Sequence, residues 1–450
     1  MLKLEPEKCF AVLILVFLLL PSMVEARKQS GIQALPLPVR LVLFKVNPML
    51  QKKEYARALK TLQDFQARGG PAPEPGQSDA KGYHHPEIYF ILGNCYLQLG
   101  QYVPAVAAYR QTLACDSTHT SAWLNLARAY YEMNQYAKAG HCFAKAYATA
   151  EIKTPEPLYY SAVAYLMADD HKHSIEIFEQ LLTAHPAAVK PEWKENLIHA
   201  LLAADQPRRA LPYIRELART YSGDKQIQWQ EILLYQYMQL EMADEALDLA
   251  LNLTRQAPTI AKWWKALTHI QLNGGWEEEA LAALIVYAFL TPLSMEEKKL
   301  LADLNLQLGI PVKAVPIYET CLKKRPNKEL LQRLILAYRQ LGRPGKALER
   351  LNTITLDPKK DTDLMMLKGE MLYSLKQFAA AASAYRRAGQ SGGRHSGRAW
   401  LMAGYAAWQI DDISAGKDAF AQAAKYKRER KAAITALRQL SQSAVILTKH

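Results

Sequence analysis

The residues best suited to bind a metal are two pairs of histidines, His84 with His85 and His171 with His173. Imidazole is a good zinc ligand, but a zinc site needs three or four ligands that converge in space. Neither pair has a third ligand at a spacing that indicates such a site. We therefore interpret them as histidines of turns, and the sequence predicts no metal site.

Motifs that support catalysis are also missing. The sequence has no His-Glu-x-x-His helix and no Cys-x-x-Cys pair. The glycine-rich stretch Gly389–Gly393 is not followed by Gly-Lys-Ser/Thr, which a phosphate-binding loop needs. The sequence therefore predicts that the protein is not an enzyme and carries no cofactor.

The cysteines fit structural roles. Cys95 and Cys142 fall in expected helices as small apolar side chains, Cys321 stands where a repeated motif has alanine, and Cys115 is near a helix end. In an oxidising compartment Cys115 and Cys142 could pair between adjacent repeats. The sequence leaves that disulfide open.

The first residues have the form of a secretory signal. Phe10–Leu20 is an apolar run of eleven residues, preceded by Lys3 and Lys8 and followed by Val24–Ala26. A run of this length is too short to span a bilayer. Val24 and Ala26, which follow it, have the small-residue spacing that suits cleavage by signal peptidase after Ala26. We expect residues 1–26 to be a signal peptide and the mature protein to be periplasmic; an uncleaved N-terminal anchor is the alternative. Formal net charge is +13 for the whole chain and +14 without this segment, so the exported protein is basic.

The rest of the chain is repetitive. Pro86–His119 carries residues that return when the sequence is shifted by 34 positions. Leu92, Gly93, Tyr96, Gly100, Tyr102, Ala105 and Tyr109 recur as Leu126, Ala127, Tyr130, Asn134, Tyr136, Ala139 and Phe143. Further units begin near Pro155, Pro191, Ile227, Ala261, Met295, Lys328, Thr362 and Gly397. A divergent unit fits 39–72, between a short N-terminal segment (27–38) and a Pro/Gly-rich insertion (73–85) that cannot continue a helix.

This 34-residue pattern resembles the tetratricopeptide repeat, in which each unit is a pair of helices. Small residues at the eighth and twentieth positions let the two backbones approach, and proline ends the second helix. The small residue of the second helix recurs as Ser174, Ala210, Ala246, Ala280, Ala314, Ala347, Ala381 and Gly416. The closing proline recurs as Pro186, Pro258, Pro292 and Pro326. We interpret Ala280–Leu290, which is apolar throughout, as a buried second helix and not a membrane segment.

Units of this kind bury their apolar faces against one another, so the end of an array needs a cap. Glu429–Leu440 has an amphipathic form, with Ile434, Leu437 and Leu440 spaced three apart. The expected fold is all-α: a right-handed superhelical solenoid of ten to eleven helix hairpins, with the array over 86–430 and a capping helix and tail over 431–450.

The repeated positions resemble those of the tetratricopeptide repeat superfamily. The resemblance implies a concave groove lined by the first helices, where the second, fifth, ninth, twelfth and thirteenth positions bind protein partners. Those positions include Phe90, Asn94, Arg128, Tyr131, Tyr159, Tyr235, Lys262, Lys265, His269, Arg339, Tyr373, Tyr405 and Trp408. Aromatic residues and arginine suit such binding, although each tyrosine could instead pack against the next unit. One cytosolic subgroup grips a terminal carboxylate with lysine at the fifth position; Phe90 stands there, which argues against that clamp.

A signal peptide followed directly by such units resembles exported tetratricopeptide repeat proteins encoded beside TonB, ExbB and ExbD. This resemblance implies a periplasmic scaffold that binds inner-membrane motor components. A scaffold for polysaccharide secretion or envelope assembly would look the same. Lysines and arginines concentrate near the C-terminus, where they fit a solvated face. The alternative is that this end associates peripherally with an anionic membrane, the cell wall or an acidic partner protein. Export argues against nucleic acid as a partner.

Overall fold

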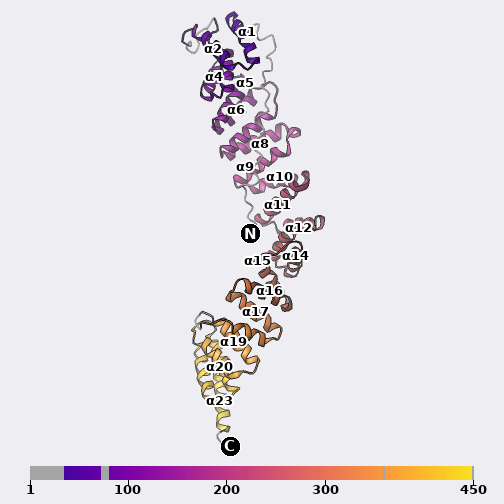
Figure 1. The fold of residues 1–450 in the computed structure, drawn as a ribbon, viewed down its shortest axis with the longest axis vertical. Helices are drawn as coiled ribbons and strands as arrows, with labels where there is room; N and C mark the ends of the chain where they lie inside the picture. The colour runs from indigo at the N-terminus through magenta and orange to yellow at the C-terminus, as the bar shows by residue number, and fades with distance from the viewer. Residues whose placement is uncertain (1–34, 72–80, 358–359, 448–450) are drawn as a thin grey trace. The chain divides into compact units, whose positions relative to one another are not determined.

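A computed structural model describes residues 35–71, 81–357 and 360–447. The expected signal peptide (1–26), most of the N-terminal segment and most of the insertion lie outside these residues, as does Cys9. The described residues form 23 α-helices and one 3-10 helix, with no strand among them. The prediction of an all-α helical repeat array is confirmed. Figure 1 traces the helix order from α1 in indigo to α23 in yellow.

The helices fall into two compact units, of which the first ends at Gln236 and the second begins at Tyr237. The helices that begin in the first unit are α1 (Leu37–Gln51), α2 (Tyr55–Ala67), α3 (Pro86–Gln98), α4 (Tyr102–Cys115), α5 (Thr120–Glu132), α6 (Tyr136–Thr149), α7 (Glu156–Met167), α8 (His171–Ala184), η4 (Pro186–Ala188), α9 (Pro191–Ala203), α10 (Pro207–Thr220) and α11 (Gly223–Gln239).

The remaining helices belong to the second unit. They are α12 (Ala243–Gln256), α13 (Ala261–Asn273), α14 (Glu277–Leu290), α15 (Met295–Gln307), α16 (Pro311–Lys324), α17 (Lys328–Gln340), α18 (Pro344–Leu351), α19 (Thr362–Ser374), α20 (Phe378–Gly389), α21 (Ser396–Trp408), α22 (Ile413–Ala423) and α23 (Arg430–Leu447). The helices up to α22 therefore form eleven successive pairs, and α23 follows the last pair.

The two helices of every pair are joined by the same tight turn. One residue of the turn has a positive φ between 55° and 76°, and the next N–H bonds to the carbonyl five residues back, as Gln101 does to Tyr96 at 2.9 Å. This helix-ending geometry favours glycine or asparagine, which adopt positive φ at little cost. The turn residues are Lys53, Gly100, Asn134, Asp169, Asp205, Glu241, Gly275, Gly309, Gly342, Lys376 and Asp411.

Close packing within a pair depends on small residues at the predicted positions. A Cβ added to Gly93 would come within 2.6 Å of the Tyr109 ring, and Gly369 lies under Tyr385 in the same way. The predicted alanines of the second helices and Ser174 are almost completely buried. The aromatic ring of one helix thus fits directly over the backbone of its partner.

Three details differ from the sequence predictions. First, α11 begins at Gly223, whose φ is 61°, and not near Ile227. The added residues include Lys225, whose Nζ lies 2.6 Å from Oε1 of Glu195. Second, the capping helix α23 buries Ala433, Ala436 and Leu440, whereas Ile434 is exposed. Alanine lets α23 approach its neighbours closely, and this rotates the buried stripe away from Ile434.

The third difference concerns α14, which was predicted to be buried. Its inner side, including Leu284 and Tyr287, is buried, but Ile285 and Phe289 on the other side are exposed. A helix of an array buries only the faces that its neighbours contact. An apolar sequence therefore did not imply burial on every side.

Candidate protein-interaction surface on the first helices

First helices of neighbouring pairs contact one another in the first unit, as α3 does α5 and α7 does α9. Between α3 and α5 the contact is an amide pair. Nδ2 of Asn125 donates to Oδ1 of Asn94 at 2.7 Å, and the Tyr109 hydroxyl donates to the same oxygen at 2.8 Å. Burial raises the pKa of Tyr109, so the phenol stays protonated and remains a donor. Because Oδ1 of Asn94 accepts both bonds, the Nδ2 hydrogens of Asn94 take no part in them.

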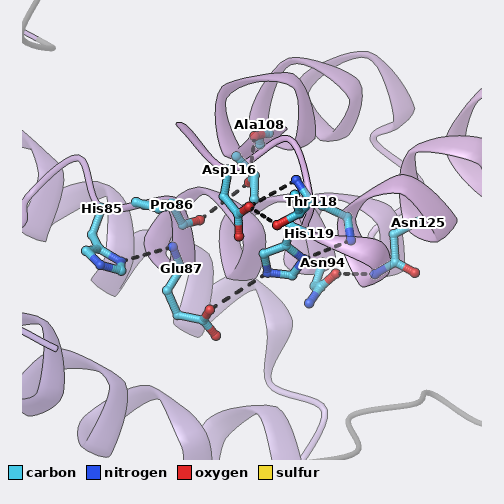
Figure 2. A network of polar contacts seen from close by, with 11 residues as sticks. His85, Pro86, Glu87, Asn94, Ala108, Asp116, Thr118, His119 and Asn125 are labelled. Atoms are coloured by element: carbon cyan, nitrogen blue, oxygen red, sulfur yellow. Dashed lines mark hydrogen bonds and ion pairs between the residues drawn. The ribbon is translucent and has the colours of Figure 1, made fainter. Parts of the chain in front are cut away.

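His119 connects the start of α5 with the start of α3. Nδ1 of His119 accepts a 3.1 Å bond from Ala122 and so caps α5, while its Nε2 lies 4.0 Å from the Glu87 carboxylate on α3. Figure 2 shows His119 between Glu87 and α5, with Asn94 and Asn125 facing each other beside it. Phe90 lies against the His119 ring, with 4.6 Å between ring centroids. Of the predicted binding residues, Phe90 therefore helps to join two repeats.

Aromatic rings continue this surface onto α7 and α9. Tyr159 is stacked on Trp193 with 4.5 Å between centroids and 12° between planes, and its hydroxyl accepts a 3.1 Å bond from Asn196. Burial raises the pKa of Tyr159 to about 12. The Tyr131 hydroxyl donates to the sulfur of Met167 at 3.3 Å. We define the first-helix face as Phe90, Asn94, Asn125, Arg128, Tyr131, Tyr159 and Asn196, all of them half-buried.

In the second unit the predicted residues mostly have partners within the protein. Nζ of Lys265 lies 2.8 Å from Glu297, and Nη1 of Arg339 lies 2.9 Å from Glu370. Burial and the charge of Lys265 lower the pKa of His269. The remaining residues contact rings: Lys262 lies over Trp263, Tyr373 packs edge-on against Phe378, and Tyr405 and Trp408 pack edge-on against Phe420. Tyr235, at the end of the first unit, is half-buried.

The carboxylates in these contacts were not found from the sequence. Each pairs with a cation on a neighbouring first helix, and the two residues of a pair lie 30 to 32 positions apart, just under one repeat. The pairs are Lys265 with Glu297, Lys299 with Glu329, Arg333 with Asp303, and Arg339 with Glu370. Charged residues of the second unit thus pair with one another between neighbouring repeats, along the face that was predicted to bind partners.

Whether the histidines and cysteines of the described residues can act as metal ligands or disulfide partners depends on their positions in the fold. Among the described residues, no three His, Cys, Asp or Glu side chains lie close enough to hold a metal ion. The imidazole of His173 contacts Asp170 at 2.7 Å, and His84 bonds to the Tyr89 hydroxyl and to the carbonyl of Gly70, so these histidines have protein partners. Cys95, Cys115, Cys142 and Cys321 are free thiols, and the structure contains no Cys115–Cys142 disulfide.

Residues 389–393 read Gly-Gln-Ser-Gly-Gly and so also match the Gly-x-Ser-x-Gly spacing of a hydrolase nucleophile elbow. In an elbow the serine lies on a sharp turn between a strand and a helix. Here Ser391 follows α20, and its hydroxyl donates to the carbonyl of Ala388 at 2.8 Å. Ser391 lies in the turn after α20, and its surroundings do not form an elbow.

Two models of the tetratricopeptide repeat match the sequence. One matches residues 50–120, 124–189 and 333–395, and the other matches residues 96–148. These segments are therefore similar to tetratricopeptide repeats. The amide pair and its neighbours on α3, α5 and α7 lie within them. In the described residues, no helix is long and apolar enough to cross a membrane.

Several solved structures are similar to this repeat array. A tetratricopeptide repeat protein from Parabacteroides merdae is 13% identical, with 67% of this chain and 98% of that chain covered and a TM-score of 0.30. MamA from Desulfovibrio magneticus RS-1 is 19% identical, with 42% and 100% covered and a TM-score of 0.32. The Cut9–Hcn1 hetero-tetramer of the APC/C is 13% identical, with 93% of both chains covered and a TM-score of 0.30. No curated protein sequence matches the chain.

Proposed function

We propose that this protein is an exported, non-catalytic scaffold that binds an extended segment of a partner protein on the first-helix face of its first unit. Tetratricopeptide repeat proteins are generally non-catalytic scaffolds for protein interactions. The observation that carries the proposal is the pair Asn94 and Asn125, joined at 2.7 Å and oriented by the buried Tyr109. An ordered amide pair offers both donors and acceptors, which is what the backbone of an extended peptide needs.

The residues around the pair support the same chemistry. Tyr131 and Tyr159 provide rigid apolar area with a polar end, and Arg128 provides a cation for a carboxylate or carbonyl group. Fixed side chains lose little entropy when a ligand binds, so a preorganised face of this kind favours affinity. The corresponding face of the second unit is less suited to binding a partner, because a ligand would have to displace ion pairs such as that between Lys265 and Glu297.

The compartment and partner rest on the sequence. The apolar run Phe10–Leu20 followed by Val24–Ala26 supports export to the periplasm, with mature protein from Arg27. The arrangement of a signal peptide followed directly by helix-pair repeats supports inner-membrane motor components of the TonB, ExbB and ExbD type as partners. Components of polysaccharide secretion or envelope assembly are the alternative partners.

Photo-crosslinking in living cells of the source organism tests the proposal. Benzoylphenylalanine at Tyr131 on the first-helix face is expected to crosslink a specific partner protein, whereas the same group at Val103 on α4, which is 67% exposed, is expected not to. Replacing Asn94 and Asn125 together by alanine should abolish the crosslink at position 131 while the far-ultraviolet circular dichroism stays unchanged. A crosslink that survives this double substitution would exclude the amide pair from binding.

The identity of the crosslinked protein separates the two partner classes. A motor component supports the energy-transduction role, and a polysaccharide-secretion or envelope-assembly protein supports the alternative. Cell fractionation tests the compartment directly: recovery of the chain with residues 1–26 in a membrane fraction would contradict cleavage after Ala26.

The basic C-terminal end is a second proposed contact, with membrane or cell wall. Five exposed cations lie near the turn between α22 and α23: Lys425, Lys427, Arg428, Arg430 and Lys431. If they dock an anionic surface, binding to cell-wall sacculi should fall as salt rises, because exposed charges are screened over about 8 Å at physiological ionic strength. Equal binding by wild type and a variant with all five changed to glutamine would leave these residues as a solvated face.

A further inference from the structure

The two terminal helices of the described array differ in what they expose. Solenoid ends generally carry a polar outer face, since no further repeat covers them. Within residues 430–442, the part of α23 whose side chains the structure describes, the last helix follows this rule: Lys431, Thr435 and Arg438 are exposed, and Ile434, at 39%, is the one exposed large apolar side chain there. The first helix, α1, does not follow it.

On α1 the inner side packs against the array and the outer side is apolar. Val39, Val42, Leu43 and Val46 are buried in the core formed with α2 and α3. Leu37, Leu41 and Phe44 are 59%, 62% and 82% exposed. Residues spaced four and three apart lie on one side of a helix. We call this stripe of Leu37, Leu41 and Phe44 the terminal face.

The charges around the terminal face have one sign. Arg40 and Lys45 are exposed beside it, and α1 contains no acidic residue. The whole hairpin from Leu37 to Arg68 carries seven lysines and arginines against two acidic residues. One of those acids, Glu54, is paired with Arg57 at 3.2 Å. The surface therefore combines exposed apolar side chains with an uncompensated positive charge.

We propose that the terminal face docks the protein on an anionic lipid surface, with α1 lying in the plane of the interface. A helix held at the interface places leucine and phenylalanine among the acyl chains and its lysines and arginines among the headgroups. Juxtaposed cations strengthen the attraction to anionic lipid. This surface is separate from the first-helix face, so the proposal does not depend on the partner-binding function.

Charge complementarity favours lipid over a second copy of the chain. Two terminal faces packed together would bring Arg40 and Lys45 of one molecule against the same cations of the other, and like charges in contact oppose association. An anionic bilayer instead neutralises both cations. It also accepts a flat stripe without the pocket that a protein hot spot generally fills.

Vesicle flotation with purified protein tests the proposal. The chain from Arg27 onward is used, so that the apolar run Phe10–Leu20 cannot contribute. It is expected to bind vesicles of phosphatidylcholine with one third phosphatidylglycerol, to bind pure phosphatidylcholine far less, and to dissociate as salt rises. Replacing Leu41 and Phe44 together by glutamine should weaken binding by roughly ten-fold or more. Replacing Arg40 and Lys45 together by glutamine should remove the preference for anionic vesicles.

The matched control replaces Val103 and Ile152 by glutamine, because these residues of the same unit are 67% and 81% exposed but lie elsewhere. It should bind vesicles as the wild type does. Unchanged circular dichroism of all variants separates loss of binding from loss of fold. The proposal is overturned if the wild type does not float with anionic vesicles, or if the Leu41/Phe44 variant floats equally well. It is also overturned if light scattering shows dimers that this variant alone abolishes while vesicle binding persists.

Discussion

The hydroxyl of Tyr109 on α4 donates a 2.8 Å hydrogen bond to Oδ1 of Asn94 on α3. The ring of the same tyrosine lies directly over Gly93, the residue before Asn94. One side chain thus holds the two helices of the repeat together and orients the amide proposed to bind a partner. Packing and recognition can be separated by substitutions that affect only one of these contacts.

Replacing Tyr109 by phenylalanine keeps the ring and removes the hydrogen bond. We expect the free energy of unfolding to fall by about 0.5–1.5 kcal/mol and crosslinking at position 131 to weaken, because Asn94 loses one of its two anchors. Urea denaturation measures the first effect. The control is Tyr136→Phe, which removes an exposed bond to Asn134 and should leave both measurements unchanged. Equal effects of the two substitutions would contradict the role given to Tyr109.

Replacing Gly93 by alanine tests the packing contact. The added Cβ would lie within 2.6 Å of the Tyr109 ring, so one of the helices must shift. We expect a loss of about 1–3 kcal/mol, as for other overpacked cores. Gly345 on α18 is the control, since a Cβ there has no neighbour within 4 Å. Alanine at that position should leave the midpoint of unfolding unchanged or raise it.

The alignment of repeats is tested at Ala139. This residue of α6 is fully buried, whereas Ala137 in the same helix is exposed. Tryptophan at position 139 should separate the helices of the pair and cost about 1–3 kcal/mol or more, and tryptophan at position 137 should cost little. Thermal unfolding followed by circular dichroism compares the two. Unaltered stability of Ala139→Trp would show that the repeat positions are wrongly assigned.

The helix pairs were predictable because each unit repeats the same physical requirements. Small residues such as Gly93 and Ala139 mark close approach, and Asn134 or Gly100 marks the turn between helices. The prediction that Ala280–Leu290 is buried was wrong for its outer side, because an apolar sequence does not show which faces of the helix have neighbours. The prediction that Ile434 lies on the buried side of α23 was wrong because alanines form the buried stripe of that helix.

The candidate surface was predictable only in part. The position of a residue within its repeat was enough to predict that Asn94 and Tyr159 belong to the candidate surface. It was not enough for Asn125, because the role of that residue depends on its contact with Asn94 in the preceding repeat. In the second unit the same repeat positions predicted Lys265 and Arg339 as partner-binding residues. Both cations instead form ion pairs with carboxylates of a neighbouring repeat. Those acids, Glu297 and Glu370, lie 32 and 31 residues further along the chain, so pairing needs knowledge of how repeats are offset.

The ion pair between Lys265 and Glu297 makes stability depend on pH. Burial alone would raise the pKa of the Glu297 carboxyl, but the Lys265 ammonium and the backbone and hydroxyl of Ser294 together lower it to about 2, from 4.5. The Tyr287 hydroxyl also donates to this carboxylate at 3.1 Å. A carboxyl whose pKa is lower in the folded state binds its proton more readily after unfolding. Its contribution is therefore complete above pH 4.5 and is lost as the pH falls towards 2.

Replacing Glu297 by glutamine should remove that contribution. We expect the variant to be less stable than the wild type by about 1.5–3 kcal/mol at neutral pH, the range for hydrogen bonds to charged groups, and the difference to shrink steadily below pH 4.5. Urea midpoints measured between pH 3 and pH 7 give the comparison. Glu329 is the control, because its carboxylate also pairs with a lysine, Lys299, but its side chain is 55% exposed. Glu329→Gln should change stability little at any of these pH values, since solvent screens an exposed pair. A difference between wild type and Glu297→Gln that is the same at pH 3 and pH 7 would show that the carboxylate charge does not stabilise α13 against α15.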